Sequence, residues 1–212
     1  MLKDNKKALI ITSIVTILPI FIGIFLWNKL PDAMAIHFDN NSEPNGYSGK
    51  FFAVFGLPLI CLAIHWFGMF ITTHDPRKQN INAKVFRLIM WAVPVISLVI
   101  ASQMYPYHLG YDVNVEYVSK LFIGVVLIII GNYLPKARQN YTIGIRTPWT
   151  LANEVNWNKT HRLAGYLWLV CGIVMILLTF AGMMKTSIMI AIVVIIIIVP
   201  FLYSFLLHVK KH

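Results

Sequence analysis

Acidic residues are scarce in this sequence, and charge of either sign is rare. The 212 residues include 8 Asp and Glu against 18 Lys and Arg, and only 12% of the chain is charged. A soluble domain carries about 25% charged residues. Cysteine is almost absent as well, with Cys61 and Cys171 alone, so a disulfide-stabilised secreted domain is excluded. These deficits also exclude a disordered chain and an ordinary soluble enzyme.

Long apolar runs take the place of the missing charge. Hydrophobic residues make up 58% of the sequence, and the mean hydropathy is +0.70. A bilayer-spanning helix needs about 20 mostly apolar residues. The composition predicts an all-α membrane protein, in which the first apolar run is too long for a signal peptide and stays on the mature chain. The six predicted transmembrane helices cover residues 8–27, 51–71, 85–104, 117–134, 163–183 and 188–207.

The net charge of +10 has a topological explanation. Cations concentrate in the two termini and in the second and fourth loops, while Lys29, Lys50, Lys120 and Lys185 lie on the other side. The positive-inside rule therefore predicts that both termini and the even-numbered loops are cytoplasmic, with no direct nucleic-acid binding. The 14 cations on the predicted cytoplasmic side are Lys3, Lys6, Lys7, Arg77, Lys78, Lys84, Arg87, Lys136, Arg138, Arg146, Lys159, Arg162, Lys210 and Lys211.

The first loop, residues 28–50, is predicted to be a structured cap outside the cell. It is rich in turn-forming residues, and Asn45-Gly46 is a tight-turn signal. Residues 33–38 form a strand or an extended segment. A metal site at His37, Asp39 and Glu43 is disfavoured, because their spacing matches no regular ligand pattern. A peptide-binding role for the loop would involve His37, Phe38, Pro44, Gly46 and Tyr47.

The fourth loop interleaves cations with aromatic rings. One interpretation places it at the lipid headgroups, where Trp and Arg gather in membrane proteins; the other makes it a recognition surface. Thr147-Pro148 resembles an N-cap followed by a first-turn proline. We therefore expect a short interfacial helix over 148–156, anchored by Trp149 and Trp157. We expect Asn158 to cap the next helix, and Glu154 to pair with a neighbouring cation.

Residue spacing makes two further predictions about the fifth span. Thr160, His161 and Ala164 should share one helical face, while Lys159, Arg162 and Tyr166 lie on another. Two glycine pairs with seven-residue spacing, Gly124 with Gly131 and Gly165 with Gly172, predict close packing of the fourth and fifth spans.

The run GNYLPKARQNYTIGIRTPWTLANEVNWNKTHRLAG, residues 131–165, resembles the signature of the SdpI/YfhL family of bacterial membrane immunity proteins. The run LPDAMAIHFDNNSEPNGYSGK, residues 30–50, is similar to DUF1648, a domain that often precedes it, although Ser42 and Asn45 replace its usual Gly and Asp. The resemblance implies a DUF1648-like helical pair over 1–84 and an SdpI-like part over 85–212. The binding residues it implies are Asn132, Lys136, Arg138, Asn140, Gly144, Arg146, Thr147, Pro148, Trp149, Trp157, Lys159, Thr160, His161 and Arg162.

The resemblance further implies function in a bacterial plasma membrane. Family members protect the cell from a secreted, membrane-active peptide toxin, and the best known also captures a cytoplasmic ArsR-type repressor at the membrane. Such a protein would contact membrane lipids, toxin and repressor, and would need no catalysis, cofactor or metal. Two alternatives remain open: a small transporter or peptide exporter, and an intramembrane or lipid-acting enzyme using His161 as acid or base. His65, in the middle of the second span, is expected to face the bundle interior as a neutral, hydrogen-bonded side chain.

Overall fold

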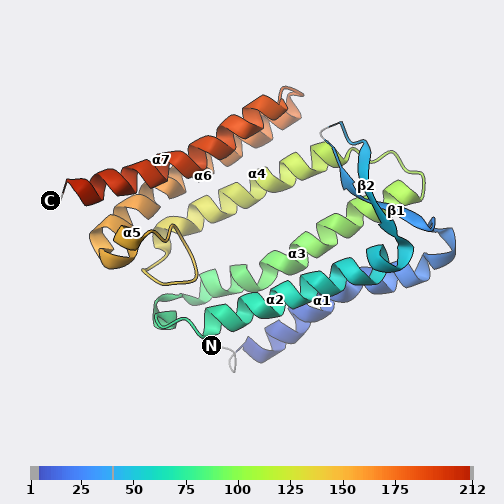
Figure 1. The fold of residues 1–212 in the computed structure, drawn as a ribbon, viewed down its shortest axis with the longest axis horizontal. Helices are drawn as coiled ribbons and strands as arrows, with labels where there is room; N and C mark the ends of the chain where they lie inside the picture. The colour runs from blue at the N-terminus through green and yellow to red at the C-terminus, as the bar shows by residue number, and fades with distance from the viewer. Residues whose placement is uncertain (1–4, 40, 211–212) are drawn as a thin grey trace. The chain divides into compact units, whose positions relative to one another are not determined.

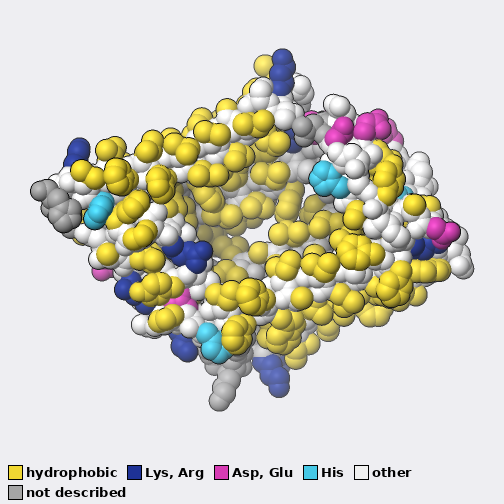
Figure 2. All heavy atoms as spheres, viewed as in Figure 1, with side chains coloured by type: hydrophobic (Ala, Val, Ile, Leu, Met, Phe, Trp, Pro, Cys, Tyr) yellow, Lys and Arg dark blue, Asp and Glu magenta, His cyan; other side chains and the backbone are white. Residues whose placement is uncertain are grey.

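The computed structural model describes residues 5–39 and 41–210, so Lys3 and Lys211 of the charge count lie outside the described residues. It confirms six helices long and apolar enough to span a membrane (Figure 1). Hydrophobic side chains cover much of the visible surface of these helices (Figure 2), as lipid contact requires. The spanning helices are α1 (Lys6–Phe25), α2 (Leu57–Thr73), α3 (Ala83–His108), α4 (Val115–Tyr133), α6 (Glu154–Phe180) and α7 (Thr186–Val209).

The prediction of an all-α fold fails only in the first loop, where the strand or extended segment predicted over residues 33–38 is confirmed as a strand. Strands β1 (Ala33–Phe38) and β2 (Pro44–Gly49) pair as an antiparallel hairpin. The predicted turn at Asn45-Gly46 is also wrong, because both residues lie within β2. The reversal instead occurs at Asp39–Glu43, where the Asp39 carboxylate accepts hydrogen bonds from the backbone N–H groups of Asn41 and Glu43. Local side-chain capping of this kind favours a turn over other conformations.

The chain divides into two compact units. Unit 1 comprises Met1–His74 and Phe86–Glu116, and unit 2 comprises Asp75–Val85 and Tyr117–His212. Most of α3 therefore groups with α1 and α2, although the sequence motifs suggest a division at residue 84. Each unit has its own set of buried residues, and short 3-10 turns (η2, Trp27–Lys29; η4, Lys78–Asn80; η5, Leu134–Lys136) join the longer elements.

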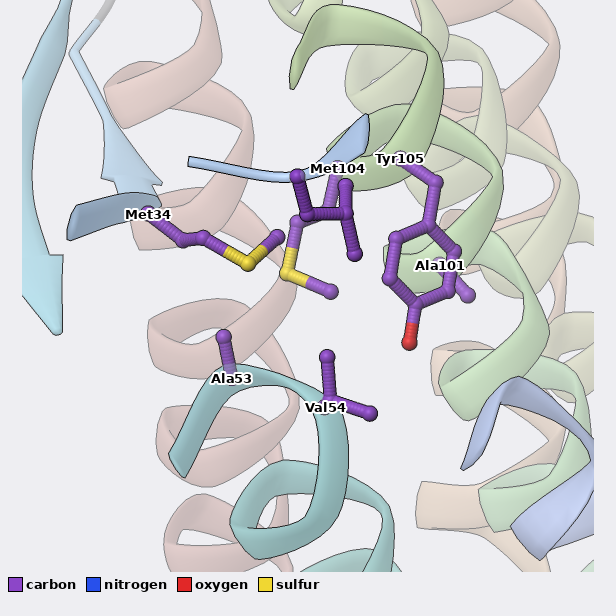
Figure 3. Packing of buried hydrophobic residues seen from close by; sticks show 7 residues of the cluster. Met34, Ala53, Val54, Ala101, Met104 and Tyr105 are labelled. Carbon is purple, nitrogen blue, oxygen red and sulfur yellow. The ribbon is translucent and has the colours of Figure 1, made fainter. Parts of the chain in front are cut away.

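The core of unit 1 fixes the hairpin to the helices. Met34 of β1 is fully buried against Ala53 and Val54, which belong to a π-helical turn, η3 (Phe52–Gly56), at the start of α2 (Figure 3). Met104 and Tyr105 of α3 complete the cluster, and the Tyr105 hydroxyl donates a hydrogen bond to the Pro19 carbonyl of α1 (2.8 Å). The hairpin is therefore held by apolar burial as well as by its own backbone pairing.

His65 faces the interior of unit 1, as predicted, and is 1% exposed. Its Nε2 lies 3.1 Å from Thr12 Oγ1. The Thr12 hydroxyl donates to the Ala8 and Leu9 carbonyls, so its oxygen accepts the proton on Nε2. The opposite ring nitrogen, Nδ1, has no hydrogen-bond partner among the described residues.

The glycine pairs of unit 2 pack α4 against α6, which confirms that prediction. A Cβ added to Gly131 would lie 2.5 Å from the Leu169 nitrogen and 2.8 Å from the Gly165 carbonyl. Only a hydrogen atom fits in that space, so the two backbones meet directly.

We predict that Gly131→Ala lowers the free energy of unfolding by about 1–3 kcal/mol, because backbone atoms cannot move aside for the new methyl group. Gly68→Ala in α2 is the matched control, since an added Cβ there meets nothing within 4 Å. Denaturant titration in detergent measures both variants. Equal stability of the two variants would contradict close packing at Gly131.

Candidate functional site

The signature loop, residues 132–162, runs from the end of α4 to the first two turns of α6. Thr147 caps the short helix α5 (Pro148–Ala152) by a reciprocal pair of bonds with Thr150, which confirms the predicted cap. The helix ends four residues before the predicted position 156. Asn153 is extended, with φ −139°, and its side chain accepts the Asn156 N–H (3.0 Å), so it caps α6 in place of Asn158.

His161 is the central residue of the loop. Its Nε2 accepts the Ile145 N–H (2.9 Å), and its Nδ1 lies 2.8 Å from the Trp157 carbonyl oxygen. A carbonyl can only accept, so Nδ1 carries the proton and Nε2 does not. Both ring nitrogens are thereby satisfied in a neutral imidazole that is 0% exposed. This arrangement leaves no free nitrogen for acid–base chemistry on a substrate.

Trp157 covers the other side of the His161 ring. The two rings stack with centroids 3.9 Å apart, and the indole N–H donates to the Ala137 carbonyl (2.7 Å). Because Trp157 is completely buried, its predicted role as a membrane-interface anchor is wrong. Trp157 instead joins the start of the loop to α6.

Gly144 allows the loop to pass over these two rings. Its φ is +115°, a conformation that residues with a side chain rarely adopt. An added Cβ would lie 2.2 Å from His161 Nε2 and 3.1 Å from Trp157 Cη2. Glycine is thus required at this position by both conformation and space.

Asn140 organises the segment that precedes Gly144. Its side-chain oxygen accepts the N–H groups of Thr142 (2.9 Å) and Ile143 (2.6 Å), and its amide donates to the Arg138 carbonyl (2.8 Å). A single buried amide therefore replaces the regular backbone pairing that this loop lacks.

Trp149 of α5 and Asn156 of α6 both hydrogen-bond to Ser204 of α7. The Trp149 indole donates to Ser204 Oγ, and the Asn156 amide donates to the Ser204 carbonyl, each at 2.9 Å. The Trp149 ring also contacts Phe201 and Phe205 and stacks on His208, with planes 16° apart. Trp149 is therefore half-buried against protein.

Residues of the second loop support the signature loop, and sequence reasoning missed them. The buried Asp75 carboxylate accepts bonds from the backbone N–H of Tyr141 (2.9 Å) and the hydroxyl of Thr142 (2.5 Å). Arg77 donates to the side chain of Gln139 and lies over the Tyr141 ring. The available signal was Asp75, the one acidic residue between the second and third spans, which precedes Pro76. Its partner Tyr141 lies 66 positions away.

The implied binding residues separate into a buried set and an exposed set. Asn140, Thr147, Trp157, Thr160 and His161 are buried and bond within unit 2, whereas Gly144 is half-buried. The predicted faces of α6 are confirmed: Thr160, His161 and Ala164 point inward. The predicted cation partner of Glu154 is absent, since this carboxylate makes no ion pair with any described residue. The exposed members of the implied set are Asn132, Lys136, Arg138, Arg146, Pro148, Lys159 and Arg162.

The hairpin residues form the second candidate site. Phe38 packs edge-on against Tyr107 (4.9 Å), His37 bonds to the Asn45 side chain, and Tyr47 is 61% exposed. At the tip, Ser42 has φ 62°, and its hydroxyl accepts the Glu116 N–H (3.0 Å).

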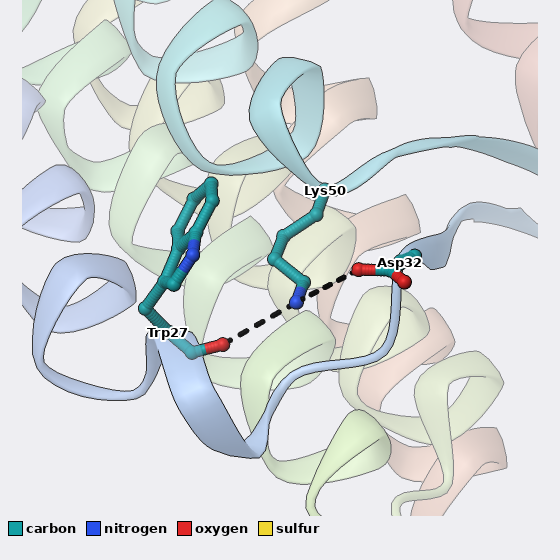
Figure 4. Close-up of polar contacts among 3 residues, drawn as sticks. All are labelled: Trp27, Asp32 and Lys50. Carbon is teal, nitrogen blue, oxygen red and sulfur yellow. Dashed lines mark hydrogen bonds and ion pairs between the residues drawn. The ribbon is translucent and has the colours of Figure 1, made fainter.

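At the base of the hairpin, where the chain enters and leaves the two strands, Lys50 makes the main side-chain contacts. Lys50 pairs with Asp32 (3.1 Å) and lies against Trp27 (Figure 4). Pro44 and Gly46 lie in β2, where they pair with Phe38 and His37 of β1. Within residues 5–39 and 41–210, no group of three His, Cys, Asp or Glu side chains could hold a metal ion.

We predict that Gly144→Ala exposes the signature loop to trypsin at Arg138 and Arg146, because the new methyl group displaces the loop from His161. Gly182→Ala is the control for the steric clash, since it also places alanine at a positive φ (+68°), where nothing lies within 4 Å. The measurement is cleavage rate in detergent. If both variants are cleaved as slowly as the parent protein, the steric requirement at Gly144 is refuted.

Comparison with known proteins identifies the family of this chain. Residues 136–204 match the SdpI/YfhL protein family, and residues 14–62 match a domain of unknown function, DUF1648. The chain is 31% identical over 205 residues to the immunity protein SdpI of Bacillus subtilis (strain 168), covering 94% of this chain and 95% of that protein. No solved structure matches. The chain is therefore a multi-pass bacterial membrane protein that belongs to the SdpI/YfhL family.

Proposed function

We propose that this protein is a non-catalytic immunity protein that protects a bacterium against a secreted, membrane-active peptide toxin. The observation that carries the proposal is the similarity to an immunity protein along 94% of the chain. The predicted binding residues that are buried hold the signature loop in a fixed conformation. A fixed loop with exposed cations suits binding of a partner better than turnover of a substrate.

The charge distribution supports an orientation for this function. With 14 of 18 cations on one side, the signature loop faces the cytoplasm and the hairpin faces the outside. Toxin would then arrive at the hairpin, while the cations of the signature loop face lipid phosphates and cytoplasmic proteins.

A signalling role extends the proposal. We propose that the exposed cations Arg138, Arg146, Lys159 and Arg162 capture an ArsR-type repressor when toxin is bound. Such coupling requires two conformations that toxin and repressor both favour to different degrees. In this proposal, one conformation keeps the contacts between Trp149 and α7, and the other conformation breaks them.

The transporter alternative has less support. A transport pathway needs polar groups free to bind substrate at the midplane. In unit 1 the intramembrane hydroxyl groups of Thr12, Thr16 and Ser97 all bond to backbone carbonyls, which is typical of structural helix packing.

We predict that expression in a sensitive bacterium raises survival against the secreted peptide fraction of Bacillus subtilis, and that Arg146→Ala and Trp149→Ala abolish this gain. Both side chains lie at the surface or half-exposed, so the variants should still insert. Lys84→Ala, an exposed cation outside the signature loop, is the control for charge alone. Survival at matched membrane expression is the measurement. No gain with the parent protein contradicts immunity, and silent substitutions contradict a role for the signature loop.

The signalling extension has a separate test. A fluorescently labelled ArsR-type repressor from the neighbouring gene region should move to the membrane when toxin is added, and Arg146→Ala should prevent this movement. A repressor that stays in the cytoplasm in cells that are nevertheless protected would refute repressor capture and leave immunity intact.

A further inference from the structure

The outer edge of β2 carries unpaired backbone groups. The Lys50 N–H donates to the Asp32 carbonyl (2.8 Å), which makes these residues a hydrogen-bonded pair. In an antiparallel ladder such pairs alternate with pairs whose N–H and C=O groups point outward. Ala33 with Gly49 and Ala35 with Tyr47 are therefore outward-pointing pairs.

A contact of α3 confirms this register. The Ala35 carbonyl points away from β2 and lies 3.2 Å from His108 Nε2. The Tyr47 backbone must then point away from β1 on the opposite side of the hairpin. Outside the β1–β2 ladder, no backbone hydrogen bond joins Tyr47 to another described segment, and the Gly49 carbonyl has only a weak local contact with Ser48 Oγ (3.4 Å).

The two edges of the hairpin therefore differ. The β1 edge is occupied by His108, and Phe38 of β1 packs against Tyr107. The β2 edge is open, and side chains along it alternate between half-buried and exposed, with Tyr47 the most prominent. An open edge strand is a template for pairing with another chain unless charge, proline or a cover blocks it.

Charge at this end of unit 1 selects the partner. Although the protein as a whole is strongly basic, five of its eight acidic residues lie in the hairpin loop, in the turn between α3 and α4 or in the first turn of α4, against two lysines. Lys50 is already paired with Asp32 (Figure 4). Acidic side chains gather over the hairpin end in Figure 2. The five acids are Asp32, Asp39, Glu43, Asp112 and Glu116.

We propose that the outer edge of β2 binds an extended, positively charged peptide segment as a third antiparallel or parallel strand. The inference rests on the proposed function, since the toxin peptide is the occupant. Backbone groups of Tyr47 and Gly49 pair with the peptide, the Tyr47 ring covers its apolar side chains, and the acidic residues attract its cations. Burial of Met34 in the core of unit 1 holds the edge in place before binding, which lowers the entropic cost.

Photo-cross-linking tests the proposal. The protein is placed in phosphatidylcholine nanodiscs, which carry no net charge, with the synthetic peptide Lys-Val-Lys-X-Lys-Val-Lys, where X is benzoylphenylalanine. We expect cross-links within residues 43–49. Gly49→Pro removes one outward N–H, which a proline in an edge strand can lack without breaking the hairpin, and should lower the yield about fivefold.

Matched variants and probes complete the experiment. Gly49→Ala keeps the N–H, and its Cβ meets nothing within 4 Å, so its yield should equal that of the parent. A peptide with Glu in place of Lys should cross-link at least about fivefold less, because like charges repel at this surface. Equal yields for Gly49→Pro and Gly49→Ala, equal yields for the two peptides, or cross-links outside 43–49 overturn the proposal.

Two readouts keep the outcome interpretable. Lys50 has a 14% exposed side chain in the folded hairpin, so trypsin cleavage there reports loss of the hairpin. If Gly49→Pro is cleaved, the pair Tyr47→Pro and Tyr47→Ala replaces it. Cross-linking at the edge without protection of cells refutes the proposed immunity function alone, whereas protection that Gly49→Pro retains in full refutes the edge alone.

Discussion

The hydrogen bonds of His161 are the interaction on which the signature loop depends. One imidazole accepts from Ile145 in the loop and donates to Trp157 on its own helix, so a segment without regular secondary structure is fixed to the membrane helix α6. The Trp157 indole extends this link to Ala137. Gly144 is glycine because these rings occupy the space where a side chain would lie. A buried network in which every group is satisfied rigidifies the structure around it.

Two of the few acidic residues organise loops through hydrogen bonds. Asp75 is buried without an ion pair among the described residues, and it satisfies its charge with N–H and hydroxyl donors from the signature loop. Asp39 forms the hairpin turn in the same manner. Most of the remaining acids lie near the hairpin, so charge of opposite sign marks the two proposed binding regions. The proposed orientation, toxin capture and cytoplasmic recognition thus all rest on one uneven distribution of charge.

Much of the fold could be predicted from the sequence because lipid permits few solutions. Six apolar runs gave six helices, and seven-residue glycine spacing gave the contact between α4 and α6. Strand β1 lies where a strand or extended segment was predicted, over residues 33–38. Strand β2 and its pairing with β1 were missed because β2 contains Pro44, Gly46 and Gly49, which have low strand propensity. The hairpin is stabilised by Met34 of β1, which is buried in a cluster with residues of η3 and α3 that lie far from it in the sequence. Helix α5 was predicted too long because Asn153 had no apolar pattern to mark it as a cap.

The candidate site was predicted as a set of residues but not as an arrangement. The sequence motif contains both the buried network and the exposed cations. Helical spacing distinguished buried from exposed residues within α6, but no periodic pattern did so in the rest of the loop. Asp75, Arg77 and Gln139 were missed because their contacts join loops more than 60 positions apart, which no local pattern reports. The implied binding residues Trp157 and His161 lie inside the protein, so in the proposed function they hold the loop that carries the exposed cations and do not contact a partner.

The state of the His161 ring tests this account most directly. Nitrogen-15 NMR of histidine in lipid bilayers, assigned by comparison with His161→Gln, reports which ring nitrogen carries the proton. We expect a single neutral tautomer protonated at Nδ1, together with a slowly exchanging Ile145 amide. A proton on Nε2, an averaged signal or a rapidly exchanging Ile145 amide would contradict it.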